Sequence, residues 1–333
     1  SSSAASDVYK RQRIVGRDYM FNIKQLTKGN NMNNLKKVGL TALGTALVAT
    51  SATAADYSIS GTSQVTFMGR DNDDTGNGWT MSDSITFSAS GEMDNGMTVS
   101  HTYEVDGGGQ GNYNVKVDTG DFGTLTFVGG SSTSVIGSWD DLTPTANEEA
   151  HGVTVGGTVA GAANGTANTT NIFLYSYNIA DGIDFSAGYS PSEGTAIVDG
   201  SLEYGIKYTG MEGLTAYAAM GENNDSSNGV DSSILSVSYA MGGLTVGYQV
   251  NESDYSTGTS DEDFSAIGVS YAVSDDLSVS LNSSTIDFES TTLDDQEATG
   301  VSFSYTSGGM TISGCLLYTS DAADEEDSVD LGG

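Results

Sequence analysis

Strict alternation of apolar and small polar residues constrains the fold of this chain more than any other feature. In the stretch 57–67, Tyr57, Ile59 and Val65 share one phase, and Ser, Thr and Gln residues fill the other. The same period of two returns at 183–189, 202–208, 244–250, 277–281 and 301–305. It predicts β-strands with one apolar and one polar face, and it argues against helices.

The connections between these segments alternate between short and long. Short turns, several with Asn-Gly or Asp-Gly pairs, fall at 94–96, 120–123, 180–182, 210–213, 241–243, 273–276 and 307–309. Longer acidic connections rich in Gly, Ser and Asn fall at 71–78, 106–112, 192–200, 222–231, 252–262 and 287–296. This order predicts an up-and-down antiparallel sheet, with the short turns at one end and the long loops at the other.

Charge separates a soluble β-sandwich from a membrane barrel. The outer faces of a sandwich carry charges, whereas here the polar phase is mostly small and uncharged, and the acidic residues gather in the long loops. This pattern is typical of a transmembrane β-barrel with an apolar outside and a polar lumen. Five tyrosines precede short turns by two or three residues: Tyr177, Tyr208, Tyr239, Tyr271 and Tyr305. They suit an aromatic girdle at one membrane interface, the alternative being ordinary cross-strand packing.

Residues 32–55 have the composition of a secretory signal peptide. A short basic stretch with two lysines is followed by an apolar stretch and by small residues that suit cleavage. The apolar stretch is too short for a membrane-spanning helix. We therefore expect export, with Ala55 or Asp56 as the first mature residue. Residues 13–31 are then upstream sequence, unless Met20 is the start.

Both ends of the chain read as translations of one sequencing adapter. Residues 2–12 can be encoded by a DNA string whose reverse complement, read one base in, encodes residues 315–325. We therefore exclude residues 1–12 and 315–333 from the reasoning about the fold. The body that remains, residues 56–314, is expected to end soon after its fifteenth strand begins.

The body is strongly acidic. Of the 11 Lys and Arg residues in the chain, eight lie in or before the leader, which leaves Arg70, Lys116 and Lys207. Of the 44 Asp and Glu residues, 36 lie in the body, which therefore carries the whole net charge of −33. Phosphate binding needs clustered basic residues, so this balance excludes a nucleic-acid partner. The single cysteine, Cys315, lies in the excluded stretch, so the body has no disulfide.

Four stretches carry a family likeness: the exported leader, ADYSISG at 55–61, the hairpin VDTGDFGTLTFVGG at 117–130, and the oversized connection 130–170. They resemble the sixteen-stranded porins of Gram-negative outer membranes, especially the alphaproteobacterial type. The likeness implies a transmembrane antiparallel β-barrel in the bacterial outer membrane, surrounded by lipid and assembled as a homotrimer. It also implies passive diffusion of small hydrophilic solutes and ions, no cofactor, and sixteen strands in the intact protein, so that C-terminal sequence is missing here.

In porins of this type the third long loop folds into the barrel, and its carboxylates face basic residues on the wall. The third long loop here is 130–170, and the acids that can fill this role are Asp140, Asp141, Glu148 and Glu149. The wall candidates are Arg70, Lys116 and Lys207, which all fall in the polar phase of their strands. The family usually has a cluster of arginines there, so we expect a weak transverse field and a preference for cations. The alternative is that the loop acids only solvate a surface loop.

Other chemistry is sparse. His101 and His151 stand alone and no GxSxG turn is present, so we expect no enzymatic activity. Asp71, Asp73 and Asp74 are dense enough to hold Ca²⁺ but lack the full calcium-loop pattern, and the alternative is a solvated outer loop. A second function therefore stays open: an exported acidic β-protein of the cell surface, stabilised by Ca²⁺, that binds without forming a pore.

Overall fold

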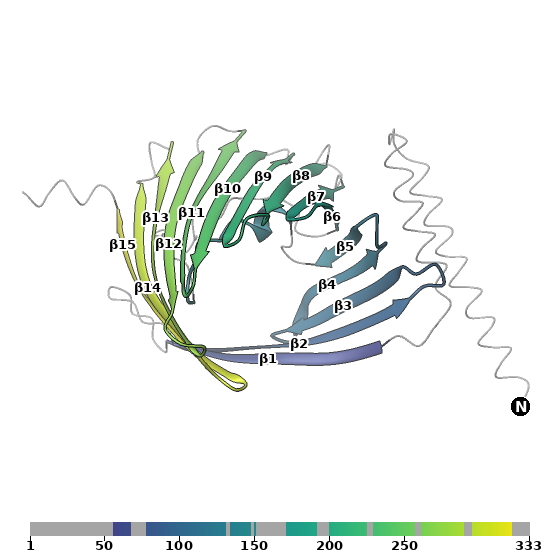
Figure 1. Ribbon diagram of the computed structural model, residues 1–333, viewed down its shortest axis with the longest axis horizontal. Helices are drawn as coiled ribbons and strands as arrows, with labels where there is room; N and C mark the ends of the chain where they lie inside the picture. The colour runs from purple at the N-terminus through teal and green to yellow at the C-terminus, as the bar shows by residue number, and fades with distance from the viewer. Residues whose placement is uncertain are drawn as a thin grey trace, which may run out of the picture. The chain divides into compact units, whose positions relative to one another are not determined.

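The computed structural model describes residues 56–67, 78–130, 134–147, 150, 171–191, 200–224, 229–256, 261–289 and 295–321. These residues form one antiparallel sheet and one short 3₁₀-helix, η1 (Ile136–Ser138) (Figure 1). The strands are β1 (Asp56–Phe67), β2 (Trp79–Glu92), β3 (Thr98–Asp106), β4 (Gly109–Asp118), β5 (Thr124–Gly130), β6 (Ile172–Ala180), β7 (Ile183–Ser190), β8 (Ser201–Tyr208), β9 (Leu214–Asn223), β10 (Val230–Met241), β11 (Leu244–Tyr255), β12 (Glu262–Ala272), β13 (Leu277–Phe288), β14 (Gln296–Ser307) and β15 (Met310–Asp321). Within this described part, no helix is long and apolar enough to cross a membrane.

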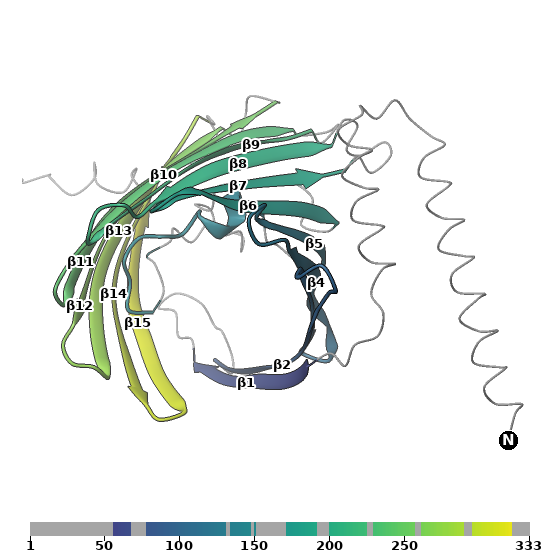
Figure 2. The same cartoon turned by 45° about the vertical axis from the view of Figure 1, so that its right-hand side comes forward.

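The sheet has 15 strands, and each strand pairs with the next one in the chain, from β1 to β15. Every pairing is antiparallel, so the order is up-and-down without a crossover. Figures 1 and 2 show that the sheet curves strongly along this order. The prediction of an all-β, up-and-down antiparallel fold is confirmed.

Tight turns join the strands at one end of the sheet, where several glycines have positive φ. Gly182 and Gly213 have φ values of 72° and 78°. A Cβ on Gly213 would also approach the carbonyl oxygen of Ala240 to 2.5 Å. Glycine adopts this left-handed backbone at little steric cost, so the sequence signal and the turn geometry agree.

One expected loop is wrong. Residues 106–112 form no long connection, because β3 ends at Asp106 and β4 starts at Gly109. Gly107 and Gly108 lie between them with φ values of 54° and 83°. Two successive left-handed residues close a two-residue hairpin whose twist matches that of the strands. The glycine run therefore specifies a turn and not a flexible loop.

The last strand also extends further than we predicted. We excluded residues 315–333 and expected the fifteenth strand to have barely begun, but β15 continues to Asp321 and pairs with β14 throughout. The alternation persists across residue 315, with Ile312 and Leu316 on the apolar face of the sheet. The edge of β14 can pair with any segment of this pattern. The adapter origin of residues 315–333 stays a prediction.

The sheet has an apolar outer face and a polar inner face, the inner one being the face that contacts residues 134–150. On β8, Leu202, Tyr204 and Ile206 point outward and are nearly half exposed, whereas Glu203 is buried on the inner face. Directly paired residues share a face, so the register extends this assignment from strand to strand. Many buried residues are polar, among them Ser232, Gln249, Asn251, Ser253, Ser280, Asn282, Ser284 and Ser302. Apolar groups outside and polar groups inside are typical of a barrel wall in lipid.

Candidate channel constriction

The described part of the connection from β5 to β6 lies along the inner face of the sheet. Its described residues, 134–147 and 150, are called the inner loop below. They contact every strand from β8 to β14 through hydrogen bonds or packed side chains. Figure 2 shows the sheet curving around this connection. The loop therefore occupies the space that the sheet partly encloses.

Glu203 of β8 fixes the start of the inner loop. Its Oε1 accepts the N–H of Val135 at 2.7 Å, and its Oε2 accepts the N–H of Ile136 at 3.1 Å. The first N–H groups of a helix have no partner within the helix, so the carboxylate caps η1. The Glu203 side chain is fully buried, and a Cβ on Gly188 or Gly221 would collide with it. The neighbouring strands thus leave room for this one carboxylate.

Apolar packing reinforces the cap. Ile136 is fully buried against Ala219 of β9. Trp139 covers Gly205 of β8, where a Cβ would strike the indole ring. The indole lies 5.2 Å from the ring of Tyr217, measured between centroids. Full burial of an aliphatic side chain contributes about 1.5–3 kcal/mol, so η1 is held by packing as well as by the hydrogen bonds to Glu203.

Two amides of β11 hold the next turn of the loop. Gln249 Oε1 accepts the N–H of Leu142 at 2.8 Å, while Gln249 Nε2 donates to the carbonyl oxygens of Trp139 (3.1 Å) and Asp140. Asn251 Nδ2 donates to the same Asp140 carbonyl at 2.9 Å. Gln249 is fully buried and Asn251 nearly so. The turn carrying Asp140 therefore has a fixed place on the wall.

The rest of the inner loop crosses β11–β14. Pro144 packs on Gly247 and Gly268, where a Cβ would meet the proline. Asn282 Nδ2 of β13 donates to the carbonyl oxygen of Pro144 at 2.9 Å. Further bonds join Ala146 N–H to Ser280 Oγ (2.9 Å), Thr145 Oγ1 with Ser302 Oγ (3.4 Å), and Ser284 Oγ to the carbonyl of Ala150. The wall thus accepts loop backbone along its length, and small inner-face residues make this possible.

Two of the four predicted constriction acids lie on the turn that β11 holds. Burial, and to a lesser degree the charge of Asp141, raises the pKa of Asp140 to about 7. Asp141 is exposed. The turn therefore presents two acidic side chains, and the charge of one of them, Asp140, changes near neutral pH. Glu148 and Glu149 lie outside the described residues.

Both predicted wall lysines that the structure describes are on the inner face. Lys116 is exposed on β4, where it pairs with Ser100 and Thr126 of the adjacent strands. Lys207 lies on β8 with its Nζ 5.6 Å from the centre of the Tyr217 ring. Arg70 lies outside the described residues. The lysines occupy separate parts of the wall, and no cluster of them forms among the residues described.

The five tyrosines lie on the outer face near the short turns. Tyr177, Tyr239, Tyr271 and Tyr305 are 38–49% exposed, and Tyr208 is partly buried. Their neighbours on this face are apolar, as a membrane interface requires. Their role as a girdle remains a prediction, since cross-strand packing would place them on the same face.

The structure gives less information about the predicted calcium site and the two histidines. Within the part of the chain that the structure describes, no group of three metal-ligating side chains comes together. The calcium candidates Asp71, Asp73 and Asp74 lie outside that part, as does His151. His101 lies exposed on β3, paired with Ala89 and Val115.

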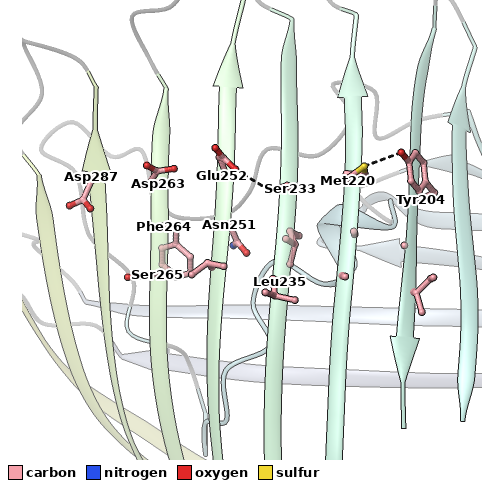
Figure 3. Close-up of a pocket in the computed structure, with 16 residues that line it drawn as sticks. Tyr204, Met220, Ser233, Leu235, Asn251, Glu252, Asp263, Phe264, Ser265 and Asp287 are labelled. Carbon is pink, nitrogen blue, oxygen red and sulfur yellow. Dashed lines mark hydrogen bonds between the residues drawn. The ribbon is translucent and has the colours of Figure 1, made fainter. Parts of the chain in front are cut away.

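One depression on the sheet lies on its outer face and is therefore separate from the inner loop. It has a volume of about 630 Å³ over β8–β13. Figure 3 shows the row that crosses it, which the strand register places side by side: Tyr204, Met220, Ser233, Glu252, Asp263 and Asp287. Tyr204 Oη donates to Met220 Sδ at 2.9 Å, and Ser233 Oγ donates to Glu252 Oε2 at 3.4 Å.

The sequence reasoning missed Glu203, Gln249 and Asn251. All three fall in the polar phase of their strands, which marked them only as lumen residues. A signal was present for Glu203, because it is a lone carboxylate between two large apolar residues, Leu202 and Tyr204, in mid-strand. For the two amides no sequence signal existed, since their role depends on where the loop lies.

Comparison with known sequences identifies one family. The sequence model described as Gram-negative porin matches residues 39–327. No match is found among the curated proteins.

Comparison of the fold gives the same group. The anion-selective porin from Comamonas acidovorans superposes with a TM-score of 0.60 at 14% identity, covering 80% of this chain and 90% of that one. OmpT, an outer membrane protein of Vibrio cholerae, gives a TM-score of 0.59 at 16% identity over 80% of this chain and 86% of that one. OmpF of Salmonella typhi gives 0.57 at 13% identity over 79% and 89%. At these identities the likeness establishes the fold.

Proposed function

Because this chain belongs to the Gram-negative porin family and forms a channel of the bacterial outer membrane, we propose that it conducts small hydrophilic solutes by passive diffusion and prefers cations. The proposal rests chiefly on one observation, the acidic turn that the inner wall holds in the lumen. Asp140 and Asp141 stand on that turn, and neutral amides fix its backbone. Fixed charges at a constriction decide which ions pass.

The charge balance of the lumen supports the same direction. The body of the chain has 36 carboxylates against three basic side chains. Charges on outer loops are screened beyond about 8 Å at physiological salt, so they steer ions toward the mouth without selecting them. Selection then falls to the acidic turn, because the low-dielectric wall around it strengthens the field inside. The fold itself does not decide the sign, since one similar structure is an anion-selective porin.

The test is the reversal potential of the channel in a planar bilayer under a salt gradient. We expect the wild-type protein to favour cations at alkaline pH. The double variant Asp140→Asn/Asp141→Asn should lower the cation-to-anion permeability ratio by about fivefold, because it removes two charges, and a unit charge ~8 Å from an ion in water contributes roughly 0.5 kcal/mol.

Asp275→Asn is the matched control. Asp275 lies exposed in the turn between β12 and β13, at the far end of the sheet from the long loops. The control should leave the permeability ratio unchanged. Anion preference in the wild-type channel, or an unchanged ratio in the double variant, would refute the proposed cation filter.

We further propose a homotrimer that associates through the outer face of β1 and β2. Tyr57, Ile59 and Met81 on this face are 80%, 70% and 69% exposed, more than the outward residues of β8. Contiguous exposed apolar surface marks interaction sites, although lipid also covers such surface. Met81→Glu should reduce the trimer seen by cross-linking in detergent, and Leu281→Glu on β13 should not.

Diffusion without catalysis completes the proposal. In reconstituted vesicles, uptake of different small sugars should rise in proportion to their concentration gradients. Saturable uptake of one solute would instead identify a specific channel. The calcium-stabilised surface protein, the second function left open by the sequence, would be released by a chelator without detergent.

A further inference from the structure

We propose that Gln249, assisted by Asn251, is a positioning residue that sets the ion selectivity of the channel by holding the turn that presents Asp140 and Asp141. This inference rests on the proposed function, since it concerns the same acidic turn. It adds a residue that touches no permeating ion and acts through the loop backbone.

The Gln249 side chain forms hydrogen bonds with three backbone groups of this turn. Gln249 Oε1 accepts from Leu142 N–H, and Gln249 Nε2 donates to the carbonyls of Trp139 and Asp140. The same Nε2 lies 2.9 Å from Asn251 Oδ1, so the second amide orients the first. Gln249 is 0% exposed, and water does not replace these bonds when they are lost.

A neutral amide is the side chain that can hold this turn without changing its charge. It supplies an acceptor and two donors in one plane, whereas a carboxylate only accepts and an ammonium only donates. A carboxylate here would face the two loop carbonyls and add a third negative charge beside the acidic pair. A lysine would neutralise one of the acids.

The hydrogen bonds of Gln249 lie between two other points at which the inner loop is attached to the wall. Upstream, Glu203 and the packing of Ile136 hold η1, and downstream Asn282 holds Pro144. Loss of Gln249 therefore releases a short stretch around Asp140 and leaves the rest of the inner loop attached. The expected consequence is a change in selectivity without loss of the folded channel.

The charge state of the turn offers an independent measure of its position. Burial is the main reason why the pKa of Asp140 rises to about 7, and the Asp141 charge adds to it. The β11 side chains that contact Asp140, Gln249 and Asn251, are neutral. Among the described residues, the other titratable groups near the inner loop include Glu203, bonded to η1, Tyr217, packed on Trp139, and Lys207, which lies over Tyr217. A released turn would expose Asp140 to water, and its pKa would fall toward the ordinary value.

The experiment compares Gln249→Leu and Gln249→Glu with wild type in the full-length channel, by reversal potential across the pH range around 7. Gln249→Leu should lower the cation-to-anion ratio at alkaline pH by about twofold, less than removal of the acids themselves. It should also move the midpoint of the pH dependence to lower pH. Gln249→Glu should detach the turn as well, because its donors are replaced by carboxylate oxygens. The conservative Gln249→Asn, which keeps the amide on a shorter stem, should restore part of the wild-type pH midpoint.

Gln64→Leu is the matched control, since Gln64 lies exposed on the inner face of β1. It should change neither the ratio nor the midpoint. All variants must keep the heat-dependent gel mobility of the folded barrel; if Gln249→Leu does not fold, Gln249→Asn carries the test with the same expected direction. An unchanged ratio and midpoint in these Gln249 variants, while Asp140→Asn/Asp141→Asn lowers the ratio, would overturn this inference alone. An unchanged ratio in the Asp140→Asn/Asp141→Asn variant would overturn the proposed function.

Discussion

Two walls of the same sheet differ in what lies on their inner faces. The covered wall, β8–β14, lies under the inner loop, and buried and exposed residues alternate along it, most regularly in β8 and β10. The open wall, β1–β3, has no described loop residue against it, and β1 is exposed on both faces along nearly its whole length. Both walls obey the same period of two. Alternation therefore specifies the face of a residue but not what covers that face.

Glycine marks the difference between the walls. The covered wall has five inner-face glycines at which a Cβ would meet the inner loop: Gly205, Gly221, Gly247, Gly268 and Gly300. At the corresponding positions of β1, β2 and β3 the inner face has no glycine and is mostly serine and threonine. A strand interior loses stability with glycine, so its use there signals the close approach of another backbone.

A large side chain in place of an inner-face glycine of the covered wall should have the largest effect on the channel. In Gly247→Leu the new side chain would occupy the place of Pro144. Overpacking costs about 1–3 kcal/mol, and the loop can avoid it only by leaving the wall. We expect a larger single-channel conductance, a lower cation preference and a lower melting temperature of the barrel. Ser60→Leu on the inner face of β1 should leave all three close to wild type, and equal effects at both sites would remove the distinction between the walls.

Removal of the buried Glu203 side chain should have the second-largest effect. Glu203→Leu leaves the N–H groups of Val135 and Ile136 without acceptors, at a cost of about 1–3 kcal/mol. The melting temperature should fall and the conductance should fluctuate. Glu104→Leu is the control on the open wall, because Glu104 also accepts a backbone N–H, that of Asn112 at 3.2 Å, but in an exposed bond. A loss of stability as large in the control would mean that cover by the loop is unimportant.

The pH dependence is the third effect in size. Asp140 has a pKa of about 7, so lowering the pH through neutrality removes one negative charge from the covered wall. The cation-to-anion ratio should therefore fall by about twofold as pH decreases through this range, and it should stay flat in Asp140→Asn. The raised pKa also means that the folded loop is stabilised at acidic pH and loses this contribution as pH rises from about 4 to about 7. A midpoint near the ordinary aspartate value would show that the turn is not buried.

Replacement of the lysines should have the smallest effect. Lys116→Met, on β4, removes an exposed cation and should raise the cation preference by less than about twofold because salt screens it. Lys207→Met should raise it less, since this ammonium lies over the Tyr217 ring, and Asp184 is the register partner of Lys207 on β7. Reversal potentials at low salt would rank the two. A larger effect of Lys207→Met would mean that the lysine on the covered wall contributes more than Lys116 to the electric field on the ions.

Much of the sheet could be predicted from the sequence because its signals are local. Alternation identified the strands and their faces, and tight-turn chemistry placed most of the hairpins. The turn prediction failed at Gly107 and Gly108, because a glycine-rich acidic stretch has the composition of a loop as well as of a turn. At residue 315 the end of the strand was set by the adapter-like sequence and not by alternation, which continues into β15.

The constriction was less predictable because its contacts join distant parts of the chain. Asp140 was predicted as a constriction acid from its charge and its long loop, whereas Gln249 and Asn251, more than a hundred residues away, look like ordinary polar-phase residues. Glu203 shows the intermediate case. It stands alone between apolar neighbours, which is a local signal that the prediction did not use, and nothing in the sequence pointed to the N–H groups of η1.

The inner loop lies on the covered wall, and an engineered disulfide between the two tests this placement. Thr145 Oγ1 lies 3.3 Å from Ser280 Oγ of β13, so cysteines at these two positions are within bonding reach. In a Cys315→Ser background, which removes the exposed thiol of this chain, Thr145→Cys/Ser280→Cys should cross-link on oxidation and retain the wild-type reversal potential. The pair Thr145→Cys/Ser88→Cys, with its second cysteine on the inner face of β2, should not cross-link. If the first pair does not cross-link, or if both pairs cross-link equally, the inner loop does not lie on the covered wall.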